Sequence, residues 1–359
     1  MNDLSMNAQN VGSSSTNHKF PFKWNLTDLE KIEKNGLKVF SCFSCGGGSS
    51  MGYKLSGYEL LGNCEIDPGV IEIYRKNHHP KYSFLMDVRD FINQDLPEEL
   101  YNLDVLDGSP PCSTFSMAGD RDKGWGVEKQ FREGQAKQRL DDLFFHFIAI
   151  AKKLQPKVVV AENVKGLIQG NAKGYVNEII RAYDDAGYKV QIFLLNAATM
   201  GVPQARERVF FIAHRKDLDF PKLVLRFNEK PITFGEVRSE KGLPVNENSH
   251  IGYLLQRRRP EDTKISDINK RLRGKNIGFT QPILSDNKVA CTLTSGAGGF
   301  RMYDGMGLSD QDCINIQTFP QDYDFGKQQV KYICGMSVPP VMMAQISLQI
   351  YEQWFKTLQ

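Results

Sequence analysis

Residues 37–214 alternate short apolar runs with segments of helical spacing, and this alternation restricts the fold more than any other feature. In the clearest helical segment, Gln138 to Leu154, apolar side chains recur along one stripe. Strands separated by helices in this rhythm are typical of a doubly wound α/β sheet with helices on both faces. We therefore predict a Rossmann-like sheet with strands at 37–42, 60–65, 105–107, 157–162, 188–195 and 208–213.

A glycine-rich loop, Gly46-Gly47-Gly48, follows the first predicted strand, and Glu65 ends the second. Glycines between a strand and a helix let a ligand approach the backbone, and an acid after the next strand can bind ribose hydroxyls. The combination indicates a nucleoside-containing cofactor, whereas the glycines alone would fit a tight turn. The spacing typical of NAD and FAD sites is missing. Cys42-x-x-Cys45 lacks the second pair that a zinc site needs, so we expect no metal.

Cys112 follows two prolines, directly after a short apolar strand. The prolines stiffen the loop and present the thiol at the carboxyl end of the strand, where open α/β sheets bind ligands. A rigidly held thiol suits a nucleophile. The alternative is a buried packing residue, which is the commoner role of a lone cysteine.

Charged side chains also lie at the ends of later strands. Glu162 ends the most apolar strand, where partial desolvation keeps a carboxyl group available as a general acid. Arg206 and Arg208 lie on one face of a strand and can bind carbonyls, carboxylates or phosphates. Taken alone, Glu162 would equally fit a helix cap or an ion pair, and the arginines would fit ordinary ion pairs.

Taken together and in this order, the segments resemble the DNA (cytosine-5) methyltransferases. The resemblance covers about residues 37–355 and rests most specifically on the Pro-Pro-Cys112 loop, Glu162-Asn163-Val164 and Gln204-Ala-Arg-Glu-Arg208. Residues 308–320 are similar to the family's ninth motif, and residues 335–340 to its tenth. The resemblance implies an S-adenosylmethionine-dependent methyltransferase that acts on double-stranded DNA.

The resemblance implies a role for each catalytic residue. The Cys112 thiolate would add to C6 of a flipped-out cytosine, so that C5 can take a methyl group. Glu162 would hold and protonate N3, while Arg208 would contact O2 and help to place Glu162. Asn163 would brace the Pro-Pro-Cys loop.

The resemblance also implies an S-adenosylmethionine site. An aromatic ring would lie against the adenine, an acid would take the ribose hydroxyls, and a proline would lie beside the methyl donor. The implied cofactor-binding residues are Phe43, Ser44, Gly46, Gly48, Glu65, Ile66, Asp87, Val88 and Pro111.

Several positions depart from the family pattern. Cys45 stands where glycine is common, and Ser113 where glutamine is common. Met336 replaces the asparagine of the tenth motif, which predicts a lost polar contact and weaker cofactor binding. Gln311 and Asn315 replace the usual arginines of the ninth motif.

Residues 215–290 contain 16 basic and 10 acidic residues, although the net charge of the whole chain is only +3. In the family this variable segment is the target-recognition domain, so we expect it to hold the major-groove side of a duplex through phosphate-binding side chains. A solvated charged surface is the alternative. The candidate DNA-binding residues are Arg257, Arg258, Arg259, Arg271, Arg273 and Lys275.

These patterns predict a flexible tail at 1–36, a catalytic and cofactor-binding domain at 37–214, a smaller target-recognition domain at 215–328 and a C-terminal segment at 329–359 that returns to the catalytic domain. Helices are expected at 308–319, begun by Ser309, and at 339–358. The seven cysteines are odd in number and scattered, which favours a reducing cytoplasm. No apolar run reaches the length of a membrane span. We expect a monomer, paired with a cognate restriction endonuclease because no regulatory domains are recognised.

Two alternatives stay open. An RNA methyltransferase of the same fold typically carries Cys-Phe-Thr in the nucleophile loop, whereas this chain has Cys112-Ser-Thr. A binding module without catalysis is disfavoured by the intact Cys112, Glu162 and Arg208, although Met336 leaves room for it.

Overall fold

A computed structural model describes residues 18–111, 142–169, 173–275, 278–296 and 298–358. The contacts divide the chain into two compact units. The first, called the sheet unit below, consists of Ile32–Asn196, Glu207–Arg226 and Met343–Gln359. The second unit consists of Met1–Lys31, Ala197–Arg206 and Phe227–Met342. The domain boundaries expected from the sequence stay a prediction.

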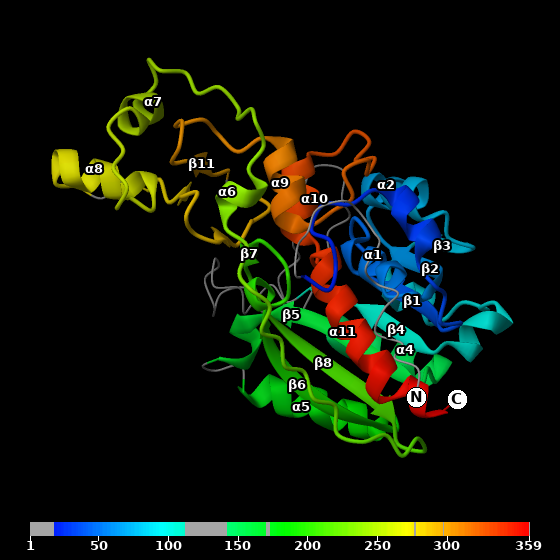
Figure 1. Ribbon diagram of the computed structural model, residues 1–359. Helices are drawn as coiled ribbons and strands as arrows, with labels where there is room; N and C mark the ends of the chain where they lie inside the picture. The colour runs from blue at the N-terminus through cyan, green and yellow to red at the C-terminus, as the bar shows by residue number, and fades with distance from the viewer. Residues whose placement is uncertain (1–17, 112–141, 170–172, 276–277, 297, 359) are drawn as a thin grey trace. The chain divides into compact units, whose positions relative to one another are not determined.

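The sheet unit is built on a seven-stranded sheet with the order β3-β2-β1-β4-β5-β8-β6 (Figure 1). Neighbouring strands are parallel except β8, which is antiparallel to both β5 and β6. The predicted doubly wound α/β fold is therefore confirmed. The strands are β1 Lys38–Cys42, β2 Glu59–Glu65, β3 Tyr82–Leu85, β4 Val105–Gly108, β5 Val158–Val164, β6 Tyr188–Asn196 and β8 Glu207–Arg215.

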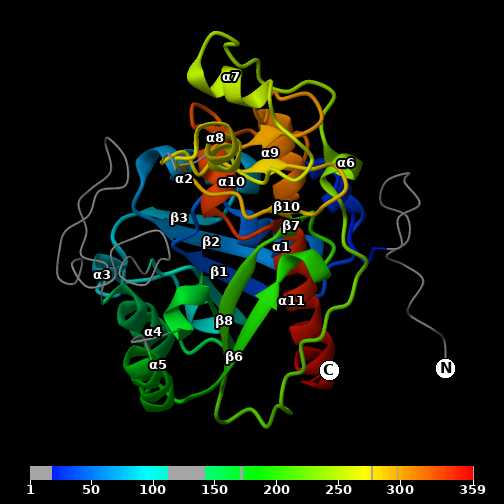
Figure 2. The same ribbon diagram turned by 90° about the vertical axis from the view of Figure 1, so that its left-hand side faces the viewer.

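Helices cover both faces of this sheet. Helices α4 and α5 lie on one side, and α1 and α11 on the other (Figure 2). On the second side, the Ser347 hydroxyl of α11 is 2.7 Å from the Ser56 hydroxyl at the end of α1. The helices of the sheet unit are α1 Gly48–Leu55, α2 Pro68–His78, α3 Val88–Phe91, α4 Leu143–Leu154 and α5 Lys173–Asp185, with most of α11 Pro340–Gln353 and the 3₁₀ turns Glu98–Asn102, Lys165–Ile168 and Phe355–Leu358.

The core of the sheet unit explains why the sequence pattern predicts this fold. Residues 158–161 of β5 are completely buried, which is the environment of a central strand covered on both faces. Helix α4 places Leu143, Phe147, Ile150 and Ala151 against the sheet along one stripe. Residues 138–141, at the start of the helix predicted at 138–154, lie outside the described residues.

The order of the strands determines where a ligand can bind. Strands β1 and β4 are neighbours, and the strand order reverses its direction between them. In open α/β sheets this switch point opens a crevice beyond the carboxyl ends of the strands. The loops after β1 and β4 are the glycine-rich loop and the Ser109-Pro110-Pro111 loop, so both functional loops start at the switch point.

The second unit contains short elements and two two-stranded sheets, β10–β7 and β11–β9. Its helix α9 begins after Ser309, whose hydroxyl accepts a hydrogen bond from the Asp312 amide, as a predicted N-cap does. The elements are the 3₁₀ turns Leu26–Lys31 and Ala197–Thr199, β7 Gln204–Ala205, α6 Phe234–Val237, α7 His250–Leu255, α8 Ile265–Arg273, β9 Ile283–Leu284, β10 Ala290–Cys291, β11 Phe300–Arg301, α9 Asp310–Gln317 and α10 Val330–Met336.

The described part of the N-terminal segment is packed, contrary to the expectation of a flexible tail at 1–36. The Trp24 side chain is 2% exposed, and its indole nitrogen donates a 3.0 Å hydrogen bond to the Thr318 carbonyl. A buried indole that satisfies its single donor is a strong packing anchor. Residues 1–17 lie outside the described residues.

One segment of the described chain, Val330–Leu358, is long and apolar enough to cross a membrane by length and composition alone. Its most apolar window is 83% buried within the protein. The segment is also divided between α10 and α11 by the Ser337-Val338-Pro339 break. Burial of this kind is the pattern of a core helix.

Candidate active site

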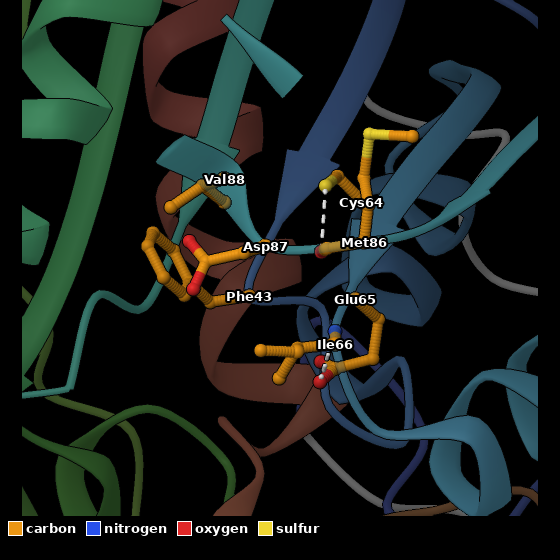
Figure 3. A pocket seen from close by; sticks show the side chains of 7 residues that line it. All are labelled: Phe43, Cys64, Glu65, Ile66, Met86, Asp87 and Val88. Carbon is orange, nitrogen blue, oxygen red and sulfur yellow. Dashed lines mark hydrogen bonds between the residues drawn. The ribbon is translucent and has the colours of Figure 1, made fainter. Parts of the chain in front are cut away.

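A pocket of the sheet unit lies beyond the carboxyl ends of β1, β2 and β3 (Figure 3). Apolar side chains and two carboxylates line it together, which is the combination that a nucleoside needs for its base and its ribose. Five of the nine predicted cofactor residues are in the lining, namely Phe43, Glu65, Ile66, Asp87 and Val88; the remaining lining residues are Cys64 and Met86.

Glu65 is held in place by backbone amides. Its Oε1 accepts hydrogen bonds from the Ile66 amide at 2.9 Å and the Asp67 amide at 3.1 Å, and its Oε2 accepts one from the Cys45 amide at 2.9 Å. Desolvation by burial raises the pKa of Glu65, and the backbone hydrogen bonds oppose this rise. A carboxylate has about four lone-pair positions, so these contacts leave room for about one hydroxyl donor at Oε2.

Asp87 is the N-cap of α3 and accepts a hydrogen bond from the Arg89 amide. Its Oδ2 also receives the Arg89 guanidinium at 2.9 Å. The carboxylate that the resemblance assigns to the adenine edge is therefore already paired with a cation. Val88, the next residue, contributes its side chain to the pocket wall.

The glycine-rich loop has a left-handed backbone at three successive odd positions. The φ angles are 51° at Phe43, 45° at Cys45 and 78° at Gly47. A side chain is disfavoured in this conformation, so Cys45 adopts a geometry that the glycine common in the family would adopt without strain. Ser44 is buried beside the loop, and its hydroxyl accepts a hydrogen bond from the side-chain Nδ2 of Asn63. Ser44, Gly46, Gly48 and Pro111 are not in the pocket lining.

At the other side of the switch point, Glu162 and Arg208 form an ion pair. The Arg208 Nε lies 2.9 Å from the Glu162 Oε1, and the two side chains are only 16% and 12% exposed. The antiparallel pairing of β5 with β8 brings these residues together across the sheet. The guanidinium therefore holds the Glu162 carboxylate in one orientation.

Asn163 connects β5 to the Pro-Pro loop. Its Nδ2 donates a 3.0 Å hydrogen bond to the Pro110 carbonyl, and its Oδ1 accepts one from the Val164 amide. The side chain is 4% exposed, so this contact is shielded from water. Cys112 itself, with Ser113, lies outside the described residues.

In the second unit, Gln204 and Arg206 are structural. Arg206 is 2% exposed and donates to the carbonyls of Leu293 and Gly335 at 3.1 Å each. The Gln204 Nε2 donates a 2.5 Å hydrogen bond to the Gln317 Oε1. The buried Arg206 guanidinium thus joins chain segments that are far apart in the sequence. Arg208 belongs to the same sequence motif, but its partner is the Glu162 carboxylate.

Gln311 and Asn315, which replace the arginines of the ninth motif, form a network of side-chain amide hydrogen bonds. Gln311 donates to Asn315 at 2.9 Å and to Gln321 at 2.7 Å, and Asn315 donates to the Val237 carbonyl at 2.6 Å. These bonds link α9 to α6 without a charge. Met336, in place of the tenth motif's asparagine, is 43% exposed at the end of α10.

The basic cluster of the second unit divides into two groups. Arg258 donates to the carbonyls of Leu255, Met302 and Tyr303, and Arg271 pairs with Asp262 at 2.7 Å. These two guanidiniums already have protein acceptors. The other four predicted DNA-binding residues, Arg257, Arg259, Arg273 and Lys275, are exposed. Of these, Arg257 donates to the Tyr253 carbonyl at 3.0 Å, and the Arg259 guanidinium lies 3.9 Å from the Glu261 carboxylate.

Three pocket-side residues were missed by the sequence analysis. Cys64 and Met86 line the pocket, and the Cys64 thiol lies 3.6 Å from the Met86 carbonyl. Asp107 lies behind the glycine-rich loop as a buried carboxylate. Cys64 and Met86 directly precede the predicted site residues Glu65 and Asp87, so their positions in the sequence could have indicated them. Nothing in the sequence marks Asp107. Among the described residues, no group of histidines, cysteines and acids is placed to hold a metal ion.

The chain matches the model of a known family, C-5 cytosine-specific DNA methylase, over residues 37–352. It belongs to this family. Among curated members, it is 37% identical to type II methyltransferase M.FnuDI of Fusobacterium nucleatum over 183 residues, which are 51% of this chain and 48% of that protein. It is 29% identical to M1.HphI of Haemophilus parahaemolyticus over 87% of this chain and 86% of that protein. The chain spans about half the length of the first two relatives that it matches.

Solved structures of other methyltransferases share the fold. A prophage-encoded DNA modification methyltransferase from E. coli superposes with a TM-score of 0.63 at 20% identity, over 89% of this chain and 99% of that one. A mutant of Spodoptera frugiperda DNMT2 gives a TM-score of 0.62 at 17% identity, over 88% and 100% of the two chains. At these identities the likeness supports the Rossmann-like fold and nothing finer.

Proposed function

We propose that this member of the C-5 cytosine-specific DNA methylase family is an active DNA (cytosine-5)-methyltransferase. The observation that supports it best is the Glu162–Arg208 ion pair beside the Asn163 bond to the Pro110 carbonyl. Together they place an acid with a fixed orientation next to the loop that leads to Cys112. In the same unit, a small pocket is lined by apolar side chains and by the carboxylates of Glu65 and Asp87, which could contact a base and a ribose.

The proposed reaction starts with addition of the Cys112 thiolate to C6 of a flipped-out cytosine. Glu162 holds and protonates N3, so the charge that develops there is neutralised and C5 becomes nucleophilic. Arg208 contacts O2 and keeps Glu162 in place. After C5 takes the methyl group, a water molecule accepts the C5 proton, the C5–C6 double bond forms again and the Cys112 thiolate leaves C6. Glu162 takes back the N3 proton, which restores both the aromatic ring and the acid.

The residues of the pocket fit S-adenosylmethionine, which supplies an electrophilic methyl group when bound. Phe43 and Ile66 offer apolar surfaces to the adenine, and Glu65 offers its remaining acceptor position to a ribose hydroxyl. Asp87 reaches the adenine edge only while sharing its charge with Arg89. We propose that Ser44, Gly46, Gly48 and Pro111 complete the site from the two loops.

We propose that the second unit binds double-stranded DNA through four of its exposed basic residues, Arg257, Arg259, Arg273 and Lys275. The Arg257 guanidinium lies 3.8 Å from the centre of the Tyr253 ring, and the Arg273 guanidinium lies 5.7 Å from it. A stacked arginine is partly oriented before it meets a phosphate. A cognate restriction endonuclease, a monomeric state and a cytoplasmic location stay predictions.

Neighbouring arginines are expected to respond differently to substitution. Arg257→Ala weakens binding to duplex DNA and reduces the slope of log affinity against log salt by about 1, because one phosphate contact is lost. Arg258→Ala leaves that slope unchanged but lowers the free energy of unfolding by about 1–3 kcal/mol, because three backbone carbonyls lose their donor. Fluorescence anisotropy at several salt concentrations and thermal unfolding measure the two effects. An equal change of slope in both variants would contradict this division.

Transfer of tritiated methyl groups from S-adenosylmethionine tests the function and its alternatives. We expect label in duplex DNA, recovered as 5-methylcytosine, and none in tRNA. Label in tRNA alone would favour an RNA methyltransferase of the same fold. No transfer to either, with DNA binding intact, would favour a binding module without catalysis.

A further inference from the structure

Asp107 is a buried carboxylate for which the proposed mechanism has no use. It is the third residue of β4, directly opposite Ser41 of β1, and its side chain is among the most buried charged groups of the sheet unit. Charged groups are rarely buried unless partners hold them.

Three hydroxyl groups surround this carboxylate. Its Oδ2 accepts hydrogen bonds from Ser41 at 2.9 Å and Ser49 at 2.8 Å, and its Oδ1 accepts a weaker one from Tyr53 at 3.4 Å. Ser49 and Tyr53 belong to α1, and Ser49 comes directly after the glycine-rich loop. One side chain of β4 thus holds β1 and the first turn of α1 at once.

The glycine-rich loop is therefore held from both of its ends. Glu65 accepts the Cys45 amide at 2.9 Å on one side, and Asp107 accepts the Ser49 hydroxyl on the other. In the sequence, β4 continues through Ser109 and two prolines to Cys112. A shift of Asp107 would move the loop of the cofactor pocket and the strand before the nucleophile together.

We propose that Asp107 is a positioning residue that ties the glycine-rich loop of the cofactor pocket to the strand leading into the Pro110-Pro111-Cys112 loop. This inference rests on the proposed function, because it assumes that the pocket binds S-adenosylmethionine. The ionised carboxylate is the form that suits this task, since it can accept from all three hydroxyls, whereas a protonated carboxyl must donate one of its contacts.

The titration of Asp107 gives this role a measurable signature. Burial raises the pKa of Asp107 to about 7, and the Ser49 and Ser41 hydroxyls oppose this rise. The other titratable groups that face it are Cys42 of β1, Tyr53 of α1, Tyr74 of α2 and Glu162 of β5. Burial raises the pKa of the thiol and of both phenols, so these three stay neutral when Asp107 titrates.

The test measures binding of S-adenosylhomocysteine by calorimetry between pH 6 and pH 8. For the unchanged protein we expect affinity to rise about fivefold with pH, the equivalent of about one net hydrogen bond. Asp107→Asn cannot ionise, so the variant loses the rise in affinity that the titration of Asp107 causes. Any pH dependence that comes from Glu65, whose pKa burial also raises, is common to both proteins. Asp104→Asn is the matched control, because Asp104 directly precedes β4 but does not contact the glycine-rich loop. Its carboxylate accepts hydrogen bonds from the Lys38 amide and the Lys157 side chain. The control is expected to keep both affinity and pH dependence.

A second variant keeps the proposal testable if Asp107→Asn does not fold. Ser49→Ala removes a donor to the ionised carboxylate, so the midpoint of the pH dependence moves to higher pH. If Asp107→Asn does fold, Ser49→Ala in that background is expected to cause little further loss of affinity, because the two residues act through one contact. An unshifted midpoint or additive losses would overturn the proposal.

Thermal unfolding tests the same group without the cofactor. Because the native pKa of Asp107 lies above its unfolded value, the unchanged protein loses stability relative to Asp107→Asn as pH rises from about 4 to about 7. A constant difference over this range would overturn the titration. If S-adenosylhomocysteine does not bind the unchanged protein, the proposed function fails and the inference with it. Normal binding with an unaltered pH profile in Asp107→Asn contradicts the inference alone.

Discussion

Replacing Glu162 with glutamine lowers kcat for methyl transfer by about 10²–10⁴-fold, while cofactor binding is unchanged. The amide keeps the shape of the side chain and can still accept from the Arg208 Nε, but it cannot deliver a proton to N3 of cytosine. Steady-state kinetics with tritiated S-adenosylmethionine and duplex DNA measure the change.

Glu207→Gln is the matched control for this substitution. Glu207 is adjacent to Arg208 in the sequence, but its carboxylate pairs with Lys165 at 2.9 Å and is 44% exposed. We expect its kcat to equal that of the unchanged protein. A similar loss in both variants, or an unchanged kcat in Glu162→Gln, would contradict the role of Glu162 as the acid.

Replacing Cys112 with alanine is expected to have the largest effect of all. Without the thiolate, C5 of cytosine does not become nucleophilic, so methyl transfer falls by about 10⁶-fold or more, to the uncatalysed background. Binding of S-adenosylhomocysteine should persist, because the pocket residues are unaltered. Cys291→Ala serves as the control, since Cys291 is an exposed free thiol in the second unit. Residual transfer by Cys112→Ala would mean that another group activates the base.

The fold was predictable because its strands are buried and apolar. Residues 158–161 of β5 are completely buried, and in the sequence they form a continuous apolar run that is typical of a central strand. Strand β3 was not predicted, because Tyr82–Leu85 is only four residues long and none of them is fully buried. Short, half-exposed strands gain their structure from pairing, here with β2, and pairing is not visible in a local pattern.

The site was predictable where a motif marks the residue and not where distant contacts decide its role. Arg257 and Arg258 are adjacent and look alike in the sequence, but only Arg258 meets the carbonyls of Met302 and Tyr303. Asp107 gains its role from Ser41 and Ser49, which lie 66 and 58 positions away in the chain. Such partners come together only through the order of the strands.

Trapping of the covalent intermediate tests the central claim most directly. Duplex DNA of mixed sequence with 5-fluorocytosine in place of cytosine is incubated with the protein and S-adenosylmethionine. Fluorine at C5 cannot leave as a proton does, so the adduct cannot eliminate the thiolate. The account predicts a stable protein–DNA complex whose cross-linked peptide contains Cys112 and which Cys112→Ala does not form. Methyl transfer to ordinary DNA without any trapped complex, or a cross-link at another residue, would contradict it.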